Sequence, residues 1–301
     1  MVAENQVEID KLIDAWYVVT MNETRDIVHR GSVAVHKDKI VDIGKTLDLE
    51  KRYQAKERLG GDRFVLTPGL VNTHIHITGE PITRGYVPDD TPFEENVFLW
   101  LCTLYSVQTA EEEVASAKLA AVEMLRSGTT CFLEAGTIYH LDEVFSELSK
   151  VGIRGRLGKW IWDLPPEPVI YRQSTDVAIE NLNRQLERYN KPSELLSAWS
   201  TLVGHTTCSD PLWREAKALA IKHDVGMSFH MSPAQIDPDG FVAEFGHRPI
   251  VHLAEIGVLD DRCALTHMVR VNDAEVDILA ESGASVAHCP TTALKLSLIH
   301  I

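Results

Sequence analysis

Two histidines separated by a single residue follow an apolar run in the first third of the chain. His74 and His76 lie in the segment Asn72-Thr73-His74-Ile75-His76-Ile77, directly after Pro68-Gly69-Leu70-Val71. Residues two apart on a β-strand point to the same face, so both imidazoles share one face, with Cα atoms roughly 7 Å apart. Imidazole nitrogens bind zinc at about 2.0–2.1 Å. The pair predicts part of a metal site, and a pair of surface or core histidines is the alternative.

Strand patterns alternate with helical patterns from Leu66 onward. After the strand that carries His74 and His76, the expected strands are Thr129–Ala135, Gly158–Trp162, Leu195–Val203, Val225–His230, Cys263–His267 and Ala284–His288. The helical patterns between them include one that begins at Thr109, where Thr109 and Glu112 form a capping box. Such alternation is typical of right-handed βαβ units and a parallel sheet.

This strand count favours a (β/α)8 TIM-type barrel of which only seven strands are present. The sequence ends in a short tail, residues 297–301, after the seventh strand, so the eighth strand is expected to be missing. A doubly wound open sheet is the competing architecture, but no Gly-x-Gly-x-x-Gly motif follows a strand. Residues 1–66 alternate short β-rich runs with turns and are expected to form a small β-sandwich portion, which leaves residues 67–301 for the barrel.

In a parallel barrel the reactive groups lie at the carboxyl ends of the strands. Histidines occur repeatedly at these ends: besides His74 and His76 they are His205, His230, His267 and His288. A single histidine at a strand end is usually a polar residue bonded to a loop. The whole set predicts a functional site.

These residues and the motifs around them resemble the amidohydrolase superfamily, in particular the branch of methylthioadenosine/S-adenosylhomocysteine deaminases and triazine chlorohydrolases. The matching segments are Pro68–His76, Arg84-Gly85, Trp100-Leu101, Ser127–Thr130, Gly204-His205, His230, Leu265–His267 and Val286–Pro290. The resemblance implies that His74, His76 and His230 are metal ligands. It also implies that His267 is catalytic, orienting water and substrate, and that His205 contacts the substrate.

The sequence departs from the family pattern at two places. The family's fourth metal ligand, an aspartate that ends the eighth strand, has no match in this chain. Deaminase-like relatives carry a proton-transferring Glu three residues after the fifth-strand histidine, where this chain has Pro233. Another group must then move the proton, and the candidates are His267, Asp237 and Glu244.

The expected cofactor is one divalent metal ion. Dinuclear members of the superfamily use a lysine on the fourth strand, and the segment Leu195–Val203 contains none. Neutral imidazoles favour Zn(II), while Fe(II) and Mn(II) are chemically acceptable. Such an ion lowers the pKa of a bound water towards about 7 and makes hydroxide available at neutral pH.

The amino-acid composition indicates which classes of binding partner are unlikely for this chain. The chain has 29 Lys and Arg against 44 Asp and Glu, a net charge of -15, which disfavours binding to nucleic acid. The sequence has no apolar stretch of the roughly 20 residues that a membrane helix needs and no signal-peptide core, so a cytoplasmic protein without membrane contact is expected. Its five cysteines are an odd number without Cys-x-x-Cys spacing and are expected to be reduced.

The favoured hypothesis is a metal-dependent hydrolase that acts on a non-peptide carbon–nitrogen bond of a small heterocyclic or amidine substrate, with a homodimer compatible with the resemblance. Two alternatives stay open. The chain could be a non-catalytic truncated fragment, or a binding module built on an inactive barrel, with which Pro233 is compatible.

Overall fold

The computed structural model describes residues 6–88, 91–165 and 172–295. The chain is made of two compact units, Met1–Gly69 and Leu70–Ile301. Within the described residues, no helix has both the length and the apolar character needed to cross a lipid bilayer.

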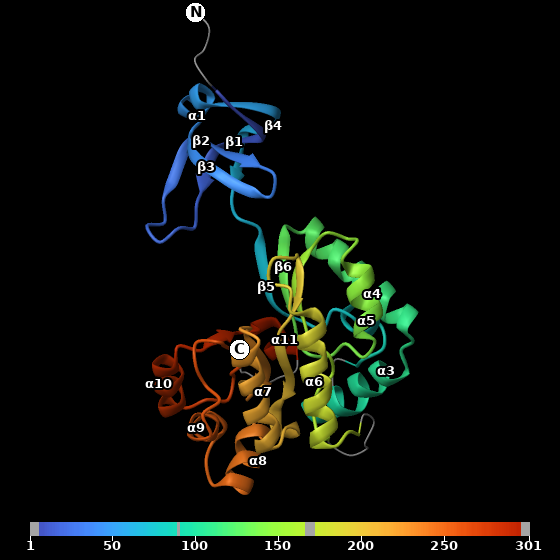
Figure 1. Ribbon diagram of the computed structural model, residues 1–301. Coiled ribbons are helices and arrows are strands. Elements are labelled where there is room, and N and C mark those ends of the chain that lie inside the picture. Colours follow the sequence, from blue (N-terminus) through green and yellow to red (C-terminus); the bar gives the residue numbers. More distant parts are fainter. Residues whose placement is uncertain (1–5, 89–90, 166–171, 296–301) are drawn as a thin grey trace, which may run out of the picture. The chain divides into compact units, whose positions relative to one another are not determined.

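The first unit is a single four-stranded sheet with one short helix (Figure 1). Its elements are β1 (Val7–Val19), β2 (Ile27–His36), β3 (Lys39–Lys45), α1 (Thr46–Arg52) and β4 (Tyr53–Leu66), and the strand order is β3-β2-β1-β4. Its buried residues form two clusters, Ile9, Leu12, Ala34 and Leu49 in one and Ala15, Val18 and Val33 in the other. Residues 6–69 form no second, facing sheet, so the expected β-sandwich stays a prediction.

The second unit alternates strands and helices, as the sequence pattern predicts. Its strands are β5 (Leu70–Ile75), β6 (Thr129–Glu134), β7 (Arg154–Leu157), β8 (Leu196–Ala198), β9 (Ser200–Gly204), β10 (Met227–Met231), β11 (Cys263–His267) and β12 (Ser285–Ala287). Its helices are α2 (Glu80–Thr83), η1 (Glu95–Leu101), α3 (Cys102–Val107), α4 (Ala110–Arg126), α5 (Leu141–Leu148), α6 (Thr175–Tyr189), η2 (His205–Thr207), α7 (Asp210–Lys222), α8 (Ile236–Phe245), α9 (Pro249–Glu255), α10 (Asp273–Ser282) and α11 (Pro290–Lys295).

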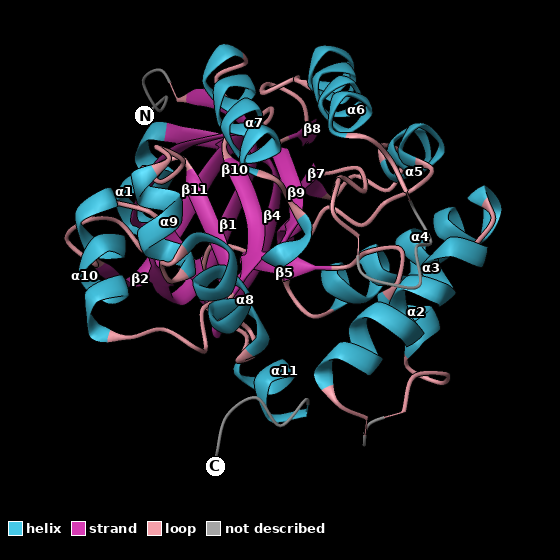
Figure 2. Cartoon of the chain, turned by 90° about the horizontal axis from the view of Figure 1, so that it is seen from below, coloured by secondary structure: helices cyan, strands magenta, loops and turns pink. Residues whose placement is uncertain are grey.

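All strand pairs of this unit are parallel, in two sheets with the orders β5-β6-β7-β8 and β12-β11-β10-β9. Helices α5, α6 and α7 lie outside the strands (Figure 2). The predicted barrel is not closed, because β5 and β12 are edge strands. Leu70 and Val71 on β5 are accordingly 61% and 60% exposed, although an interior barrel strand would bury such side chains.

Two predicted strands differ from those in the structure. The expected strand Gly158–Trp162 is wrong: β7 ends at Leu157, and the Gly158 backbone N–H donates to the Glu134 carboxylate at 3.3 Å. The expected strand Leu195–Val203 is divided at Trp199 into β8 and β9. Side-chain bonds and bends of this kind have no hydrophobic signature, so periodicity does not reveal them.

The predicted helix after Thr109 is confirmed as α4, together with its capping box. The Glu112 N–H donates to the Thr109 hydroxyl at 3.3 Å, and the Thr109 N–H donates to the Glu112 carboxylate at 2.8 Å. These bonds satisfy two N–H groups that the first helical turn leaves without partners. α4 in turn packs against β6 and α5.

We expect Thr109→Ala to lower the free energy of unfolding by about 1 kcal/mol, because the substitution removes the side-chain oxygen of the cap. Urea denaturation followed by circular dichroism measures this change. Glu111→Ala, an exposed position in the same turn, is the matched control. Equal stability of the two variants would contradict the role of the cap.

Candidate metal centre

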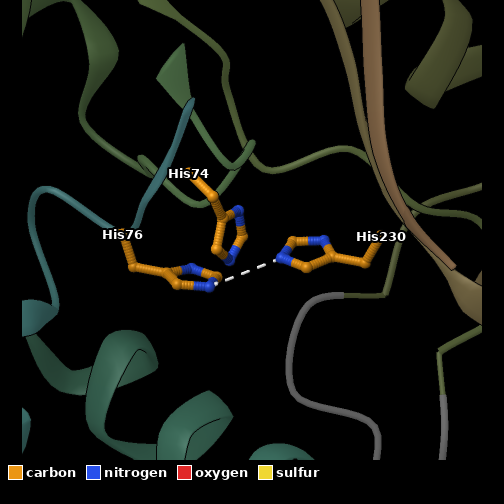
Figure 3. A group of neighbouring side chains, drawn as sticks. All are labelled: His74, His76 and His230. Carbon is orange, nitrogen blue, oxygen red and sulfur yellow. Dashed lines mark hydrogen bonds between the residues drawn. The ribbon is translucent and has the colours of Figure 1, made fainter. Parts of the chain in front are cut away.

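Three imidazole rings from two strands that are far apart in the sequence point towards one centre (Figure 3). His74 lies in β5, His76 follows directly after this strand, and His230 lies in β10. One nitrogen from each ring belongs to a group whose members all lie within 4.8 Å of one another. The convergence expected of His74, His76 and His230 is therefore present.

The partners behind two of these rings fix which ring nitrogen carries the proton. His230 Nδ1 lies 2.6 Å from the Val203 carbonyl oxygen, which only accepts, so Nδ1 is the donor. His76 Nδ1 lies 3.1 Å from the Thr137 hydroxyl, and that hydroxyl donates its own proton to Glu134 at 2.7 Å. When Glu134 is ionised, Thr137 therefore accepts from His76 Nδ1–H. In both neutral rings Nε2 is left with its lone pair.

The two Nε2 atoms face each other at 3.4 Å, the contact drawn as a dashed line in Figure 3. Two nitrogens bound to one tetrahedral zinc ion at about 2.0–2.1 Å lie roughly 3.3–3.4 Å apart. Two lone pairs at this distance repel unless a cation lies between them. The donor set and its spacing thus fit a divalent metal ion.

Burial keeps these imidazoles neutral. It lowers the pKa of His76 to about 4, helped by the nearby His205, and it lowers the pKa values of His74 and His230 well below the usual histidine range, helped by the other imidazoles. Only a neutral ring offers a lone pair to a metal ion. The site is therefore ready to bind a cation at neutral pH without first releasing protons.

His267 and His205 lie beside the three rings and line the same cavity. His267 ends β11, and its ring centroid is 5.2 Å from that of His74 and 5.5 Å from that of His230. Burial lowers its pKa to about 3, and its buried Nδ1 has no hydrogen-bond partner among the described residues. His205 stacks on His230 with centroids 5.2 Å apart. His288, the other strand-end histidine, is exposed.

Several residues at these strand ends have a left-handed backbone. His205, Ser232, His267 and Met268 have φ values of 56°, 50°, 80° and 52°, and five other non-glycine residues with positive φ lie away from the site. The four residues at the site follow or end the adjacent strands β9, β10 and β11. Left-handed conformations of this kind cost energy and are typical of functional sites.

The cavity has a volume of about 260 Å³, and aromatic side chains form much of its wall. Trp160, Trp162, Tyr105, Phe93 and Phe98 all line it. The two tryptophans are not among the site residues that the sequence predicts. They belong to the lining because residues 158–162 leave the sheet as a loop. The segment that supplies Phe93 and Phe98 has no motif that marks it in the sequence.

Pro233, in the loop after β10, has no acid or base, but the helix that follows this loop, α8, carries a buried carboxylate. Asp237 is 1% exposed and accepts hydrogen bonds from His205 Nδ1 at 2.9 Å and from the Ser232 N–H at 2.8 Å. Glu244, the other carboxylate considered from the sequence, is exposed. Of these two acidic groups, the structure brings Asp237 next to a histidine of the cavity.

Glu134, at the end of β6, supports the site from behind Thr137. The side chain is fully buried and accepts hydrogen bonds from the N–H groups of Gly136 and Thr137, at 2.7 and 3.1 Å, as well as from the Thr137 hydroxyl. Burial raises the pKa of Glu134 to about 7, against the opposing effect of these bonds. The chain of bonds from Glu134 through Thr137 to His76 orients the imidazole.

The comparisons with known proteins agree with this arrangement. Residues 65–298 match the model of the Amidohydrolase family. The chain belongs to this family. It is 29% identical over 296 residues to a 5-methylthioadenosine/S-adenosylhomocysteine deaminase of Thermodesulfovibrio yellowstonii, with 95% of this chain and 64% of the relative covered.

Solved structures give the same picture of the family fold. An adenosine deaminase from Xanthomonas campestris with bound zinc superposes with a TM-score of 0.86 at 28% identity, covering 97% of this chain and 65% of that one. An atrazine chlorohydrolase from Arthrobacter aurescens, complexed with zinc, superposes with a TM-score of 0.84 at 18% identity, covering 95% and 67%. The chain therefore spans about two thirds of the length of these relatives.

The raised pKa of Glu134 predicts a pH effect on stability. Between pH 4.5 and about 7 the carboxyl is protonated in the folded state but ionised in the unfolded state, so its contribution to stability falls as the pH rises through this window. We expect the unfolding free energy of the wild type, relative to Glu134→Gln, to decrease by up to about 3 kcal/mol from pH 4.5 to 7. Denaturant titrations of both proteins at several pH values measure it, and a constant difference would contradict it.

Proposed function

We propose that this chain provides the metal-binding and substrate-binding part of a hydrolase that cleaves a non-peptide carbon–nitrogen bond in a small heterocyclic or amidine molecule. The observation that carries the proposal is the pair of unprotonated Nε2 atoms of His76 and His230, 3.4 Å apart and beside His74. Relatives whose names describe them as deaminases support the same class of reaction.

His74, His76 and His230 would hold the metal ion, for which Zn(II) is the first choice and Fe(II) or Mn(II) are alternatives. When bound, such an ion supplies Lewis-acid activation of water at neutral pH. His76 Nδ1–H donates to the Thr137 hydroxyl and His230 Nδ1–H donates to the Val203 carbonyl, and these bonds hold the two rings in the required tautomer.

The remaining residues of the cavity would bind and orient the substrate. His267 and His205 each present an imidazole to the cavity, and the neutral His267 can donate one ring N–H to an oxygen that gains negative charge. Trp160, Trp162 and Tyr105 offer flat apolar surfaces to a ring. The described lining contains no Asp, Glu, Lys or Arg, which suits an uncharged substrate.

The volume of the cavity supports a small substrate. Its roughly 260 Å³ lies just below the range of ligand pockets, about 300–1,000 Å³.

We also propose that residues 1–66 form a β-sandwich portion and residues 67–301 a hydrolase barrel. We further propose that the protein assembles as a homodimer.

Removing one of the proposed ligands should abolish stoichiometric metal binding. We expect the purified chain to bind about one zinc ion, and His74→Ala and His230→Ala to lose it, because two imidazoles and water compete poorly with a chelator. Metal analysis after dialysis against a weak chelator measures this. His288→Ala, an exposed strand-end histidine, is the matched control.

The same proteins test the reaction. The zinc-loaded wild type is expected to release ammonia from at least one of adenosine, 5-methylthioadenosine or an aminotriazine, and the two ligand variants are not. Zinc binding without turnover of any of these compounds would favour an inactive binding module. Unchanged zinc content in His74→Ala and His230→Ala would overturn the proposal itself.

Thr137 gives a separate test of the support behind His76. Thr137→Val removes the hydroxyl that accepts from His76 Nδ1, and we expect zinc affinity to fall roughly 10–100-fold. Thr137→Ser keeps the hydroxyl and should bind zinc as the wild type does. Competition with a zinc-binding dye measures all three affinities, and equal affinity of Val and Ser variants would show that this bond is unimportant.

A further inference from the structure

Asn96 is a buried polar residue of the cavity wall that lies outside the histidine cluster. It is the second residue of η1, it lines the cavity, and it is 3% exposed. η1 is a π-helix, a rare conformation that occurs frequently at functional sites. Buried polar groups are nearly always hydrogen-bonded, so the partners of this amide indicate its role.

The NH2 end of the Asn96 side chain is fully used. Nδ2 donates to the Pro88 carbonyl oxygen at 2.9 Å and to the Thr91 hydroxyl at 3.1 Å. A carbonyl oxygen only accepts, so the nitrogen of the amide, and not its oxygen, faces Pro88. An amide nitrogen has two protons, and these two bonds use both of them.

The oxygen of the same amide is free to accept. Within the part of the chain that the structure describes, no group donates a hydrogen bond to Asn96 Oδ1, and this oxygen is not one of the fully buried polar atoms that lack a partner. It is therefore accessible. Asn96 lines the cavity, whereas Pro88 and Thr91 do not, so Oδ1, at the opposite end of the amide, is the polar atom that Asn96 presents to the cavity.

Apolar contacts hold the segment that carries Asn96. Phe93 belongs to a small buried cluster that joins it to Ala234, in the loop before α8, and to Ala293 in α11, and Val97 packs against this cluster. The side chains on either side of Asn96 in the sequence are thus tied to two other segments of the unit. An acceptor in a fixed place orients a ligand and selects among ligands.

We propose that Asn96 is a specificity-determining residue whose Oδ1 accepts a hydrogen bond from an N–H or O–H group of the substrate. The inference rests on the proposed function for the existence of a substrate, and it deepens that function: the hydrolase takes a small uncharged heterocycle or amidine that carries such a donor. A pocket built around a hydrogen bond discriminates strongly against an analogue without the donor, because the buried acceptor is then left unpaired.

The first test compares discrimination between substrate analogues in three proteins. Asn96→Leu removes the acceptor at nearly the same side-chain size. Thr91→Val, the matched control, removes a partner of the same amide but keeps Oδ1. The probes are adenosine, its three monodeoxy analogues and N,N-dimethyladenosine, each analogue lacking one donor group, or the corresponding dimethylamino derivatives if an aminotriazine is turned over instead.

For at least one analogue we expect kcat/KM to be roughly tenfold or more below that of the parent compound in the wild type and in Thr91→Val. In Asn96→Leu this difference should fall towards one. Damage to the fold lowers kcat/KM for all probes alike, so the ratio reports recognition. An unchanged ratio in Asn96→Leu, at unchanged zinc content, would overturn the inference although the enzyme is active, whereas a wild type that turns over none of the probes defeats the proposed function.

The second test measures the direction of the amide without a substrate. Asn96→Leu identifies the NH2 signals of Asn96 in ¹H–¹⁵N spectra of the labelled full chain. Because both protons are bonded to Pro88 and Thr91, we expect them to exchange with water at least roughly tenfold more slowly than those of an exposed amide such as Gln54. Exchange as fast as at Gln54 would place the NH2 group in the cavity and overturn the inference, whether or not a substrate is found.

Discussion

The candidate site depends on hydrogen bonds made on the far side of three of its imidazoles. The Val203 carbonyl, the Thr137 hydroxyl and the Asp237 carboxylate each take the Nδ1 proton of a different ring, those of His230, His76 and His205. A free histidine exchanges between tautomers, and a ring with Nε2–H cannot accept or coordinate through that atom. The acceptors behind His76 and His230 therefore leave two Nε2 lone pairs directed at a common centre, and Asp237 fixes the orientation of His205 beside them.

Burying these imidazoles costs free energy, and the backbone at the adjacent strand ends is strained as well. Buried imidazoles lose hydration, so their pKa values fall and their charged forms are excluded. The backbone conformation also costs free energy, because His205, Ser232 and His267 adopt positive φ values at adjacent strand ends. The surrounding parallel strands and the core packed around Trp162, Trp213, Phe132 and Phe229 hold these conformations in place.

Much of this arrangement could be predicted from the sequence, and the reasons differ between fold and site. Helix α4 was predictable because its capping box is a local signal. Strand β4 has 14 residues and no buried position, so it is longer than the short β-rich runs that the sequence predicts for residues 1–66. His74 and His76 were predictable because the alternation of a strand converts a spacing of two into one face. The aromatic side chains that line the cavity could not be predicted. The path of the chain after β7 depends on hydrogen bonds such as the one from the Gly158 N–H to the Glu134 carboxylate, which the sequence pattern does not reveal.

Asp237 shows how a missing residue in a motif can be informative. The family pattern places an acid three residues after the strand-end histidine, and proline at position 233 removes it. Four residues further along, the first turn of α8 brings a carboxylate back, but directed at His205 and not at the cavity, whose described lining it does not join. A carboxylate in that place cannot exchange protons with a substrate directly; it can act only through the imidazole that it holds.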